Sequence, residues 1–218
     1  LNRGDIIIDG GNSYFKDSQR RYNELKQKGI HFLDIGTSGG IVAAERGYCI
    51  MVGGDKNAFD HVEPLLKSLA MPGGYLYIGE AGSGHFIKMV HNAIEYGMMQ
   101  SIAEGYNLLE NGPYKDLHLA KISNLWNNGS IVSSFLIEMT QLALEEDPKL
   151  EKIEGFVEDS GEGKWAIQTA LEHSVPMETI AQALFSRYSS RKRGEFAHKI
   201  LAAQRNKFGA HPVKEAGK

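Results

Sequence analysis

The chain changes its sequence pattern near residue 79, and this change limits the folds open to it. Before Gly79, β-branched and aromatic runs alternate with amphipathic segments, as in a parallel sheet with covering helices. We expect strands at residues 6–8, 30–35, 48–52 and 75–78, and helices at about 14–28 and 57–69. Beyond Gly79 the pattern predicts helices alone, separated near residues 111–113, 127–129, 147–148 and 175–176. The predicted fold class is α/β followed by all-α.

Composition excludes several classes of protein. The 218 residues are 42% hydrophobic, which is ample for a buried core, and the formal net charge of -3 gives no reason to expect nucleic acid or an anionic membrane as partner. No apolar run approaches the ~20 residues of a membrane span. Cys49 is the single cysteine, fits a reducing compartment, and is interpreted as buried packing. We interpret the chain as cytoplasmic.

The first strand is expected almost at the start of the chain, which begins with Leu1. An α/β dinucleotide domain carries G-x-G-x-x-G after its first strand, and residues 1–80 contain no such motif. We therefore expect a preceding segment with the phosphate loop, and expect this chain to be inactive alone. That segment would also hold the residue that selects NAD or NADP, so the choice stays open. A small complete domain without a nucleotide site is the alternative.

Four polar residues, Lys88, His91, Asn92 and Glu95, have the spacing i, i+3, i+4 and i+7, which places them along one stripe of a helix. A cation, an imidazole, an amide and a carboxylate on one stripe suit acid/base chemistry. A solvated surface with a Lys/Glu pair is the alternative. His91 and Glu95 could also hold a metal, but no third ligand is supplied nearby, so we expect none. The same helix has an apolar face formed by Phe86, Val90, Ala93 and Ile94.

Five separated motifs resemble the decarboxylating 6-phosphogluconate dehydrogenases. They are Asp9-Gly-Gly-Asn-Ser13, Thr37-Ser-Gly-Gly40, the segment 82–97, Gly161-Glu-Gly-Lys-Trp165 and Phe208-Gly-Ala-His211, and the resemblance runs from residue 2 to residue 212. It implies the short form of the family. Residues 1–80 would be the C-terminal half of a Rossmann-like dinucleotide-binding domain. Residues 81–218 would be a helical substrate-binding and dimerisation domain.

The resemblance implies oxidative decarboxylation of 6-phospho-D-gluconate to D-ribulose 5-phosphate with NADP or NAD, a step of the pentose phosphate pathway. Lys88 would be the general base for the 3-hydroxyl, and Glu95 would protonate C1 of the enediol. Asn12 would lie beside both nicotinamide and substrate. The implied substrate-binding residues are Asn12, Ser38, Gly39, Gly40, His91, Asn92, Tyr96, Lys164, Arg187, Arg205 and His211.

Lys164, Arg187 and Arg205 would bind the phosphate, since cations suit that group. The sequence departs from the family at Ala43, where Gly is common, and at Ala166, where a Thr is expected. The resemblance also implies a homodimer or higher oligomer whose exchanged C-terminal tails carry Arg205 and His211 into the partner's site.

Two rival interpretations remain. One is another β-hydroxyacid dehydrogenase, such as the 3-hydroxyisobutyrate type, which shares the Gly84-x-x-x-Lys88-x-x-x-Asn92 element. Lys164 and Arg205 argue against it, as do His91 and Glu95, because a substrate without phosphate needs no cationic cluster. The other is a non-catalytic fragment that binds sugar phosphate or only dimerises.

Overall fold

The computed structural model describes residues 1–191, 195–209 and 212, which pack as two compact units. The sheet unit comprises residues 1–95 and 161–177, and the helical unit comprises residues 96–160 and the described residues from 178 onward. The domain boundary expected after residue 80 stays a prediction. Among the described residues, no helix is long and apolar enough to cross a membrane.

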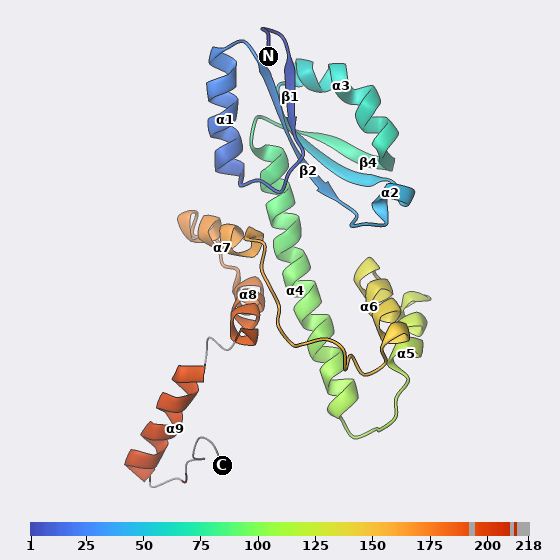
Figure 1. The fold of residues 1–218 in the computed structure, drawn as a ribbon, viewed down its shortest axis with the longest axis vertical. Coiled ribbons are helices and arrows are strands. Elements are labelled where there is room, and N and C mark those ends of the chain that lie inside the picture. Colours follow the sequence, from blue (N-terminus) through green and yellow to red (C-terminus); the bar gives the residue numbers. More distant parts are fainter. Residues whose placement is uncertain (192–194, 210–211, 213–218) are drawn as a thin grey trace. The chain divides into compact units, whose positions relative to one another are not determined.

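The sheet is mixed rather than wholly parallel. Its strand order is β1-β2-β3-β4, with β1 (Ile6–Asp9), β2 (His31–Ser38), β3 (Tyr48–Gly54) and β4 (Ala70–Gly79) (Figure 1). β1/β2 and β3/β4 are parallel, but β2/β3 is antiparallel, so the expectation of a parallel sheet is wrong at this pair. The physical reason is the short connection through residues 39–47, since a parallel crossover needs about a dozen residues or more. It holds only the short helix α2 (Ala43–Arg46).

β2 also extends further than expected. The strand was expected to end at residue 35, whereas Gly36, Thr37 and Ser38 pair with β3 and continue it. This extension brings Ser38 to the end of the sheet.

Helices account for the rest of the regular structure. They are α1 (Phe15–Gln27), α3 (Lys56–Leu69), α4 (Ser83–Asn111), α5 (Leu119–Asn127), α6 (Phe135–Glu146), α7 (Glu162–Glu172), α8 (Glu178–Ser190) and α9 (Glu195–Gly209). In the part of the chain that the structure describes, the predicted change to an all-helical pattern after residue 79 is confirmed. The helix ends at residues 111, 127 and 146 agree with the predicted separators.

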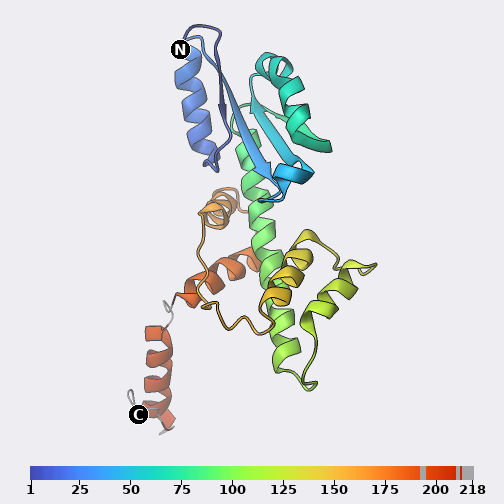
Figure 2. The ribbon, with the colours of Figure 1, turned by 45° about the vertical axis from the view of Figure 1, so that its right-hand side comes forward.

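The two faces of the sheet are covered by different helices. Leu33, Ile35, Ile50 and Val52 pack with apolar residues of α3 into one buried cluster. Because side chains alternate along a strand, the intervening residues of β2 and β3 point to the opposite face, where α4 begins. Figure 2 shows α1 and α3 on opposite sides of the sheet.

The start of α4 is held by a buried carboxylate. Asp34 of β2 is fully buried and accepts hydrogen bonds from the backbone N–H groups of Gly82 (2.7 Å) and His85 (2.9 Å). The first N–H groups of a helix have no partner within the helix, and a negative charge there is favourable. Asp34 therefore caps α4 from a neighbouring strand and fixes where the helix meets the sheet.

Glycines allow the close approach that this cap requires. A Cβ at Gly84 would contact the backbone oxygens of Asp34 and Met51, the latter at 2.6 Å, and the nitrogen of Gly53 at 2.7 Å. Because these are backbone atoms of paired strands, they cannot shift without distorting the sheet. The first turn of α4 therefore lies directly on β2 and β3.

We predict that Gly84→Ala destabilises the fold by about 1–3 kcal/mol, because the added methyl overpacks the helix–sheet contact. Gly105→Ala, in the same helix, is the matched control, since a Cβ there meets nothing within 4 Å. Replacing an exposed helical glycine by alanine should stabilise by about 0.5–1 kcal/mol. Denaturant unfolding measures both, and equal effects of the two changes would contradict the argument.

Candidate active site

The polar stripe of α4 is half-buried in the structure: Lys88, His91, Asn92 and Glu95 all have intermediate exposure. The face that packs inward is formed by His85, Met89 and Ala93, each at most 2% exposed. Ser18 of α1 holds His85 through a 2.7 Å hydrogen bond to Nδ1.

The predicted apolar face is wrong at one position. Ile94 is 51% exposed. The capped first turn directs the face containing residues 85, 89 and 93 inward, so residue 94 lies off that face.

Lys88 has the environment that a general base needs. Burial lowers the pKa of its ammonium from the ordinary value of 10.5, while the charges of Glu95, Glu162 and Cys49 act in the opposite direction. Gly36 makes room for the lysine stem, since a Cβ there would overlap Lys88 Cβ. Burial therefore favours the neutral amine, the form that can accept a proton.

A line of hydrogen bonds joins β2 to α4. Ser38 Oγ lies 3.1 Å from His91 Nε2, and His91 Nδ1 lies 2.9 Å from Asn92 Oδ1. Glu95 Oε2 is 4.0 Å from the same Nδ1. Among the described residues, no group of three or more His, Cys, Asp or Glu is placed to hold a metal ion.

Glu162 joins this group of side chains in the structure, although sequence reasoning did not single it out. It is 2% exposed, and its Oε1 accepts hydrogen bonds from Asn92 Nδ2 at 2.6 Å and from Asn12 Nδ2. An acidic residue in the first turn of a helix is usually read as a surface residue that favours the helix dipole. The sequence signal that could have pointed to Glu162 was its position within the motif Gly161-Glu-Gly-Lys-Trp165.

The loop after β2 depends on glycine geometry. Gly39 and Gly40 have positive φ angles of 127° and 61°. A Cβ at Gly39 would come within 2.6 Å of Ala43 Cβ, so Ala43, buried at 2% exposure, packs closely against this turn. The turn presents backbone N–H groups beside Ser38.

Cys49 was predicted to be buried and is exposed. It pairs in register with Ser38, at the start of β3. Strand alternation puts it on the same face as Met51 and Gly53, which α4 covers, but Cys49 lies at the end of the strand and stays exposed. An apolar sequence run is thus a poor guide at the end of a strand.

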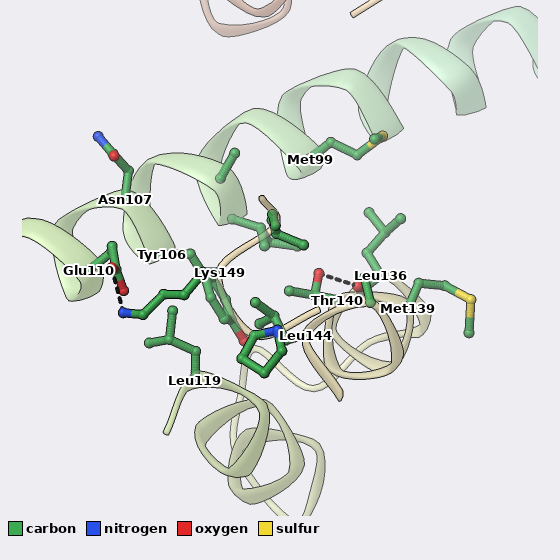
Figure 3. A pocket seen from close by; sticks show the side chains of 15 residues that line it. Met99, Tyr106, Asn107, Glu110, Leu119, Leu136, Met139, Thr140, Leu144 and Lys149 are labelled. Carbon is green, nitrogen blue, oxygen red and sulfur yellow. Dashed lines mark hydrogen bonds and ion pairs between the residues drawn. The ribbon is translucent and has the colours of Figure 1, made fainter. Parts of the chain in front are cut away.

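A cavity in the helical unit has a different character. A cavity of about 550 Å³ lies among α4, α5 and α6 and is lined mainly by apolar side chains (Figure 3). Glu110 and Lys149, the charged residues of its lining, form an ion pair at 2.7 Å. This cavity therefore lacks a set of polar side chains gathered on one surface, which the α4 stripe has.

Comparison with known proteins identifies the family. Residues 1–79 match the family model described as the NAD binding domain of 6-phosphogluconate dehydrogenase, and residues 84–199 match its C-terminal domain. The chain belongs to the 6-phosphogluconate dehydrogenase family. The predicted resemblance and the Rossmann-like character of the sheet unit are thereby confirmed.

Two proteins named as 6-phosphogluconate dehydrogenases are similar in sequence to nearly the whole chain. Bacillus subtilis YqeC, provisionally named as such an enzyme, is 49% identical over 215 residues, which is 99% of this chain and 72% of YqeC. The NAD(+)-dependent decarboxylating enzyme of Haloferax volcanii is 40% identical, covering 98% of this chain and 71% of its own length.

A solved Plasmodium falciparum 6-phosphogluconate dehydrogenase superimposes with a TM-score of 0.80 at 34% identity. It was studied without ligand, with NADP+ and with 6-phosphogluconate. The match covers 100% of this chain, which spans about half (48%) of the Plasmodium chain.

The remaining predicted site residues lie on several helices. Lys164 is exposed on α7 of the sheet unit. In the helical unit, the guanidinium carbon of Arg187 lies 3.5 Å from the centroid of the Tyr96 ring, and the Tyr96 hydroxyl accepts from Ser160 N–H at 3.3 Å. Arg205 is exposed on α9. His211 lies outside the described residues.

The structure therefore gathers Asn12, Ser38, His91 and Asn92 into one network within the sheet unit, next to Lys88 and Glu95. Tyr96 and Arg187 form a second group within the helical unit. The substrate roles expected for these residues stay predictions.

We predict that Lys88→Met raises folding stability at neutral pH. The folded-state pKa lies below the ordinary 10.5. Between those two values the unfolded chain binds more protons, so the wild type gains stability as pH rises through that window. Below it, the charged ammonium carries its full burial cost, which methionine does not.

The difference in unfolding free energy should therefore shrink as pH approaches 10.5. Denaturant unfolding at pH 7 and near pH 10 tests this, with exposed Lys121→Met as control. A variant no more stable than wild type at pH 7 would contradict the stated environment of Lys88.

Proposed function

We propose that this chain carries the catalytic residues of an NAD- or NADP-dependent 6-phosphogluconate dehydrogenase. The reaction converts 6-phospho-D-gluconate to D-ribulose 5-phosphate and CO2, a step of the pentose phosphate pathway, and we place it in the cytoplasm. Family membership supports the reaction class. The observation that carries it is Lys88, half-buried with a lowered pKa, on one helix stripe with Glu95.

The residues divide the reaction between them. Neutral Lys88 takes the proton of the substrate 3-hydroxyl, and the bound nicotinamide supplies the hydride acceptor for C3. The resulting ammonium gives its proton to the 3-keto oxygen as CO2 leaves, which neutralises the charge that develops there and forms the enediol. Glu95 delivers a proton to C1 of the enediol, while the neutral Lys88 takes the proton of the enediol hydroxyl that becomes the ketone of the product. Lys88 then releases this proton to solvent, and Glu95 regains a proton from solvent.

The described residues fit the nicotinamide end of the cofactor. Asn12 follows β1, at the carboxyl edge of the sheet where open α/β sheets bind ligands, and its amide reaches the same carboxylate as Asn92. Asn12 would thus lie between cofactor and substrate. The cofactor is NAD or NADP, since relatives and family models name an NAD-binding domain and both nucleotides.

The substrate would lie along the network of Asn12, Ser38, His91 and Asn92, with Gly39 and Gly40 offering backbone N–H groups. Its phosphate would be bound by Tyr96, Lys164, Arg187 and Arg205, and His211 would contact the substrate from the tail. The lysine and the two arginines distinguish the proposal from a 3-hydroxyisobutyrate-type enzyme, whose substrate carries no phosphate. A direct comparison of 6-phosphogluconate with 3-hydroxyisobutyrate as substrates would decide between them.

In the protein expressed from its full coding sequence, Lys88→Ala should abolish nicotinamide reduction, because no base removes the 3-hydroxyl proton. Glu95→Gln should slow turnover by about 100- to 10,000-fold. A single-turnover burst of reduction should survive in Glu95→Gln, because the acid acts after oxidation. Stopped-flow absorbance measures this.

Glu104→Gln is the matched control on α4. Glu104 is exposed, and its carboxylate accepts a hydrogen bond from Gln100 Nε2 at 2.7 Å. Near-normal reduction by Lys88→Ala would remove Lys88 from the role of base.

We also propose that the enzyme is at least a homodimer with exchanged C-terminal tails. α9 exposes Phe196 (74%), Ile200 (43%) and Leu201 (57%), and apolar residues at this spacing favour a partner surface. Arg205 lies further along the same helix. In a two-fold arrangement, each tail would then complete the other subunit's phosphate site.

Refolding a mixture of Lys88→Ala and Arg205→Ala full-length variants tests the exchange. Each heterodimer would pair the intact body of one chain with the intact tail of the other, restoring one site in two. Random pairing should therefore recover about a quarter of wild-type activity. If each tail served its own subunit, demonstrated heterodimers would show no recovery.

A further inference from the structure

We propose that Glu162 is a positioning residue whose carboxylate fixes the donor and acceptor sense of the hydrogen-bond network formed by Asn12, Asn92, His91 and Ser38. This inference deepens the proposed function, on which its consequence for substrate rests. The direct evidence is the meeting of two asparagine side chains, from residues 12 and 92, on one buried carboxylate oxygen.

The carboxylate removes a choice that asparagine otherwise has. An amide can present either its oxygen or its NH2 group, whereas an ionised carboxylate only accepts hydrogen bonds. Asn92 must therefore turn Nδ2 toward Glu162, at 2.6 Å. Its Oδ1 consequently faces His91 Nδ1, at 2.9 Å.

The orientation of Asn92 in turn determines where the protons of His91 and of Ser38 on β2 lie. Because Asn92 Oδ1 can only accept, neutral His91 must carry its proton on Nδ1, which leaves Nε2 as an acceptor. Ser38 Oγ lies 3.1 Å from Nε2 and must donate its hydroxyl proton there. One carboxylate thus determines two amide orientations, one imidazole tautomer and one hydroxyl direction.

The position of Glu162 suits a buried negative charge. It is the first residue of α7, and its N-terminal neighbour Gly161 has φ of 107°. A helix N-terminus and two N–H donors both stabilise negative charge. The Glu162 side chain is 2% exposed, so its carboxylate is largely shielded from water.

This arrangement has a consequence for substrate recognition. With its proton committed to His91, Ser38 offers lone pairs rather than a donor to a ligand. Ser38 would therefore accept a hydrogen bond from a sugar hydroxyl, while the backbone N–H groups of Gly39 and Gly40 remain available for a carboxylate.

The first test reads the tautomer of His91 directly, without turnover. Nitrogen-15 NMR of histidine-labelled, full-length protein should show His91 protonated on Nδ1, with the resonance assigned by its loss in His91→Gln. Glu162→Met keeps the length of the side chain but removes the acceptor oxygen. Asn92 is then free to turn, and His91 should populate both tautomers. Retention of the Nδ1–H tautomer in Glu162→Met would overturn the proposal.

The second test separates charge from shape. Glu162→Gln keeps the size of the side chain but removes the charge. Because its amide can turn either its oxygen or its NH2 group toward Asn92, His91 should again populate both tautomers. Lys88 faces Glu95 of α4, Glu162 of α7 and Cys49 of β3, whose charges raise its pKa against burial. Loss of one carboxylate should lower that pKa, so the acidic limb of the kcat/KM profile should move to lower pH. If the acidic limb of the kcat/KM profile stayed at the same pH in Glu162→Gln, this would contradict the proposal that a charged Glu162 lies beside Lys88.

Glu172→Gln is the matched control: it makes the same change on the same helix, at an exposed residue paired with Lys16. It should leave tautomer, pH limb and substrate affinity unchanged. Calorimetric binding of 6-phosphogluconate should weaken about 10- to 100-fold in Glu162→Met, because the amide groups of Asn12 and Asn92 lose the acceptor that orients them.

Thermal melts establish that each variant is folded. A merely structural Glu162 would lower stability without changing the tautomer or the pH limb, and that pattern would also overturn the proposal. If wild-type protein neither bound nor oxidised 6-phosphogluconate, the proposed function would fail while the tautomer test still stood.

Discussion

The cap that Asp34 provides for α4 determines where the polar stripe of Lys88, His91, Asn92 and Glu95 lies on the sheet. A fully buried carboxylate on a central strand accepts two N–H bonds from the first turn of the helix, and Gly84 lets that turn lie on the strand backbones. Helix position and rotation are then set together, since both donors belong to one turn. Lys88, one turn onward, is carried to Gly36, where its stem is buried. The lowered pKa of Lys88 is thus a consequence of the helix–sheet junction.

Two carboxylates on different elements balance that burial. Glu95 and Glu162 raise the pKa of Lys88 while burial lowers it more. Burial favours the neutral amine and the two carboxylates favour the ammonium, so the influences act in opposite directions on one group. The expected stability gain of Lys88→Met has the same origin, since burying an ammonium is costly to the fold.

In the polar network next to Lys88, the carboxylate of Glu162 sets which group donates and which accepts in each hydrogen bond. Hydroxyls, amides and neutral imidazoles each accept or donate, so a line of them has two self-consistent senses. A carboxylate at one end permits one sense alone. Specificity for a polyhydroxylated substrate requires that choice, because a donor in place of an acceptor would leave a buried group unpaired.

The sequence by itself determined the class of fold, the family motifs and the stripe of Lys88, His91, Asn92 and Glu95, because helical periodicity and motif order are local properties. It did not determine the antiparallel β2/β3 pair, the exposure of Cys49 and Ile94, or the role of Glu162. These depend on connection length, on which face a cap turns inward, and on contacts between residues far apart in the chain. Glu162 and Asn12 are 150 positions apart, and only tertiary packing puts that carboxylate between two asparagines.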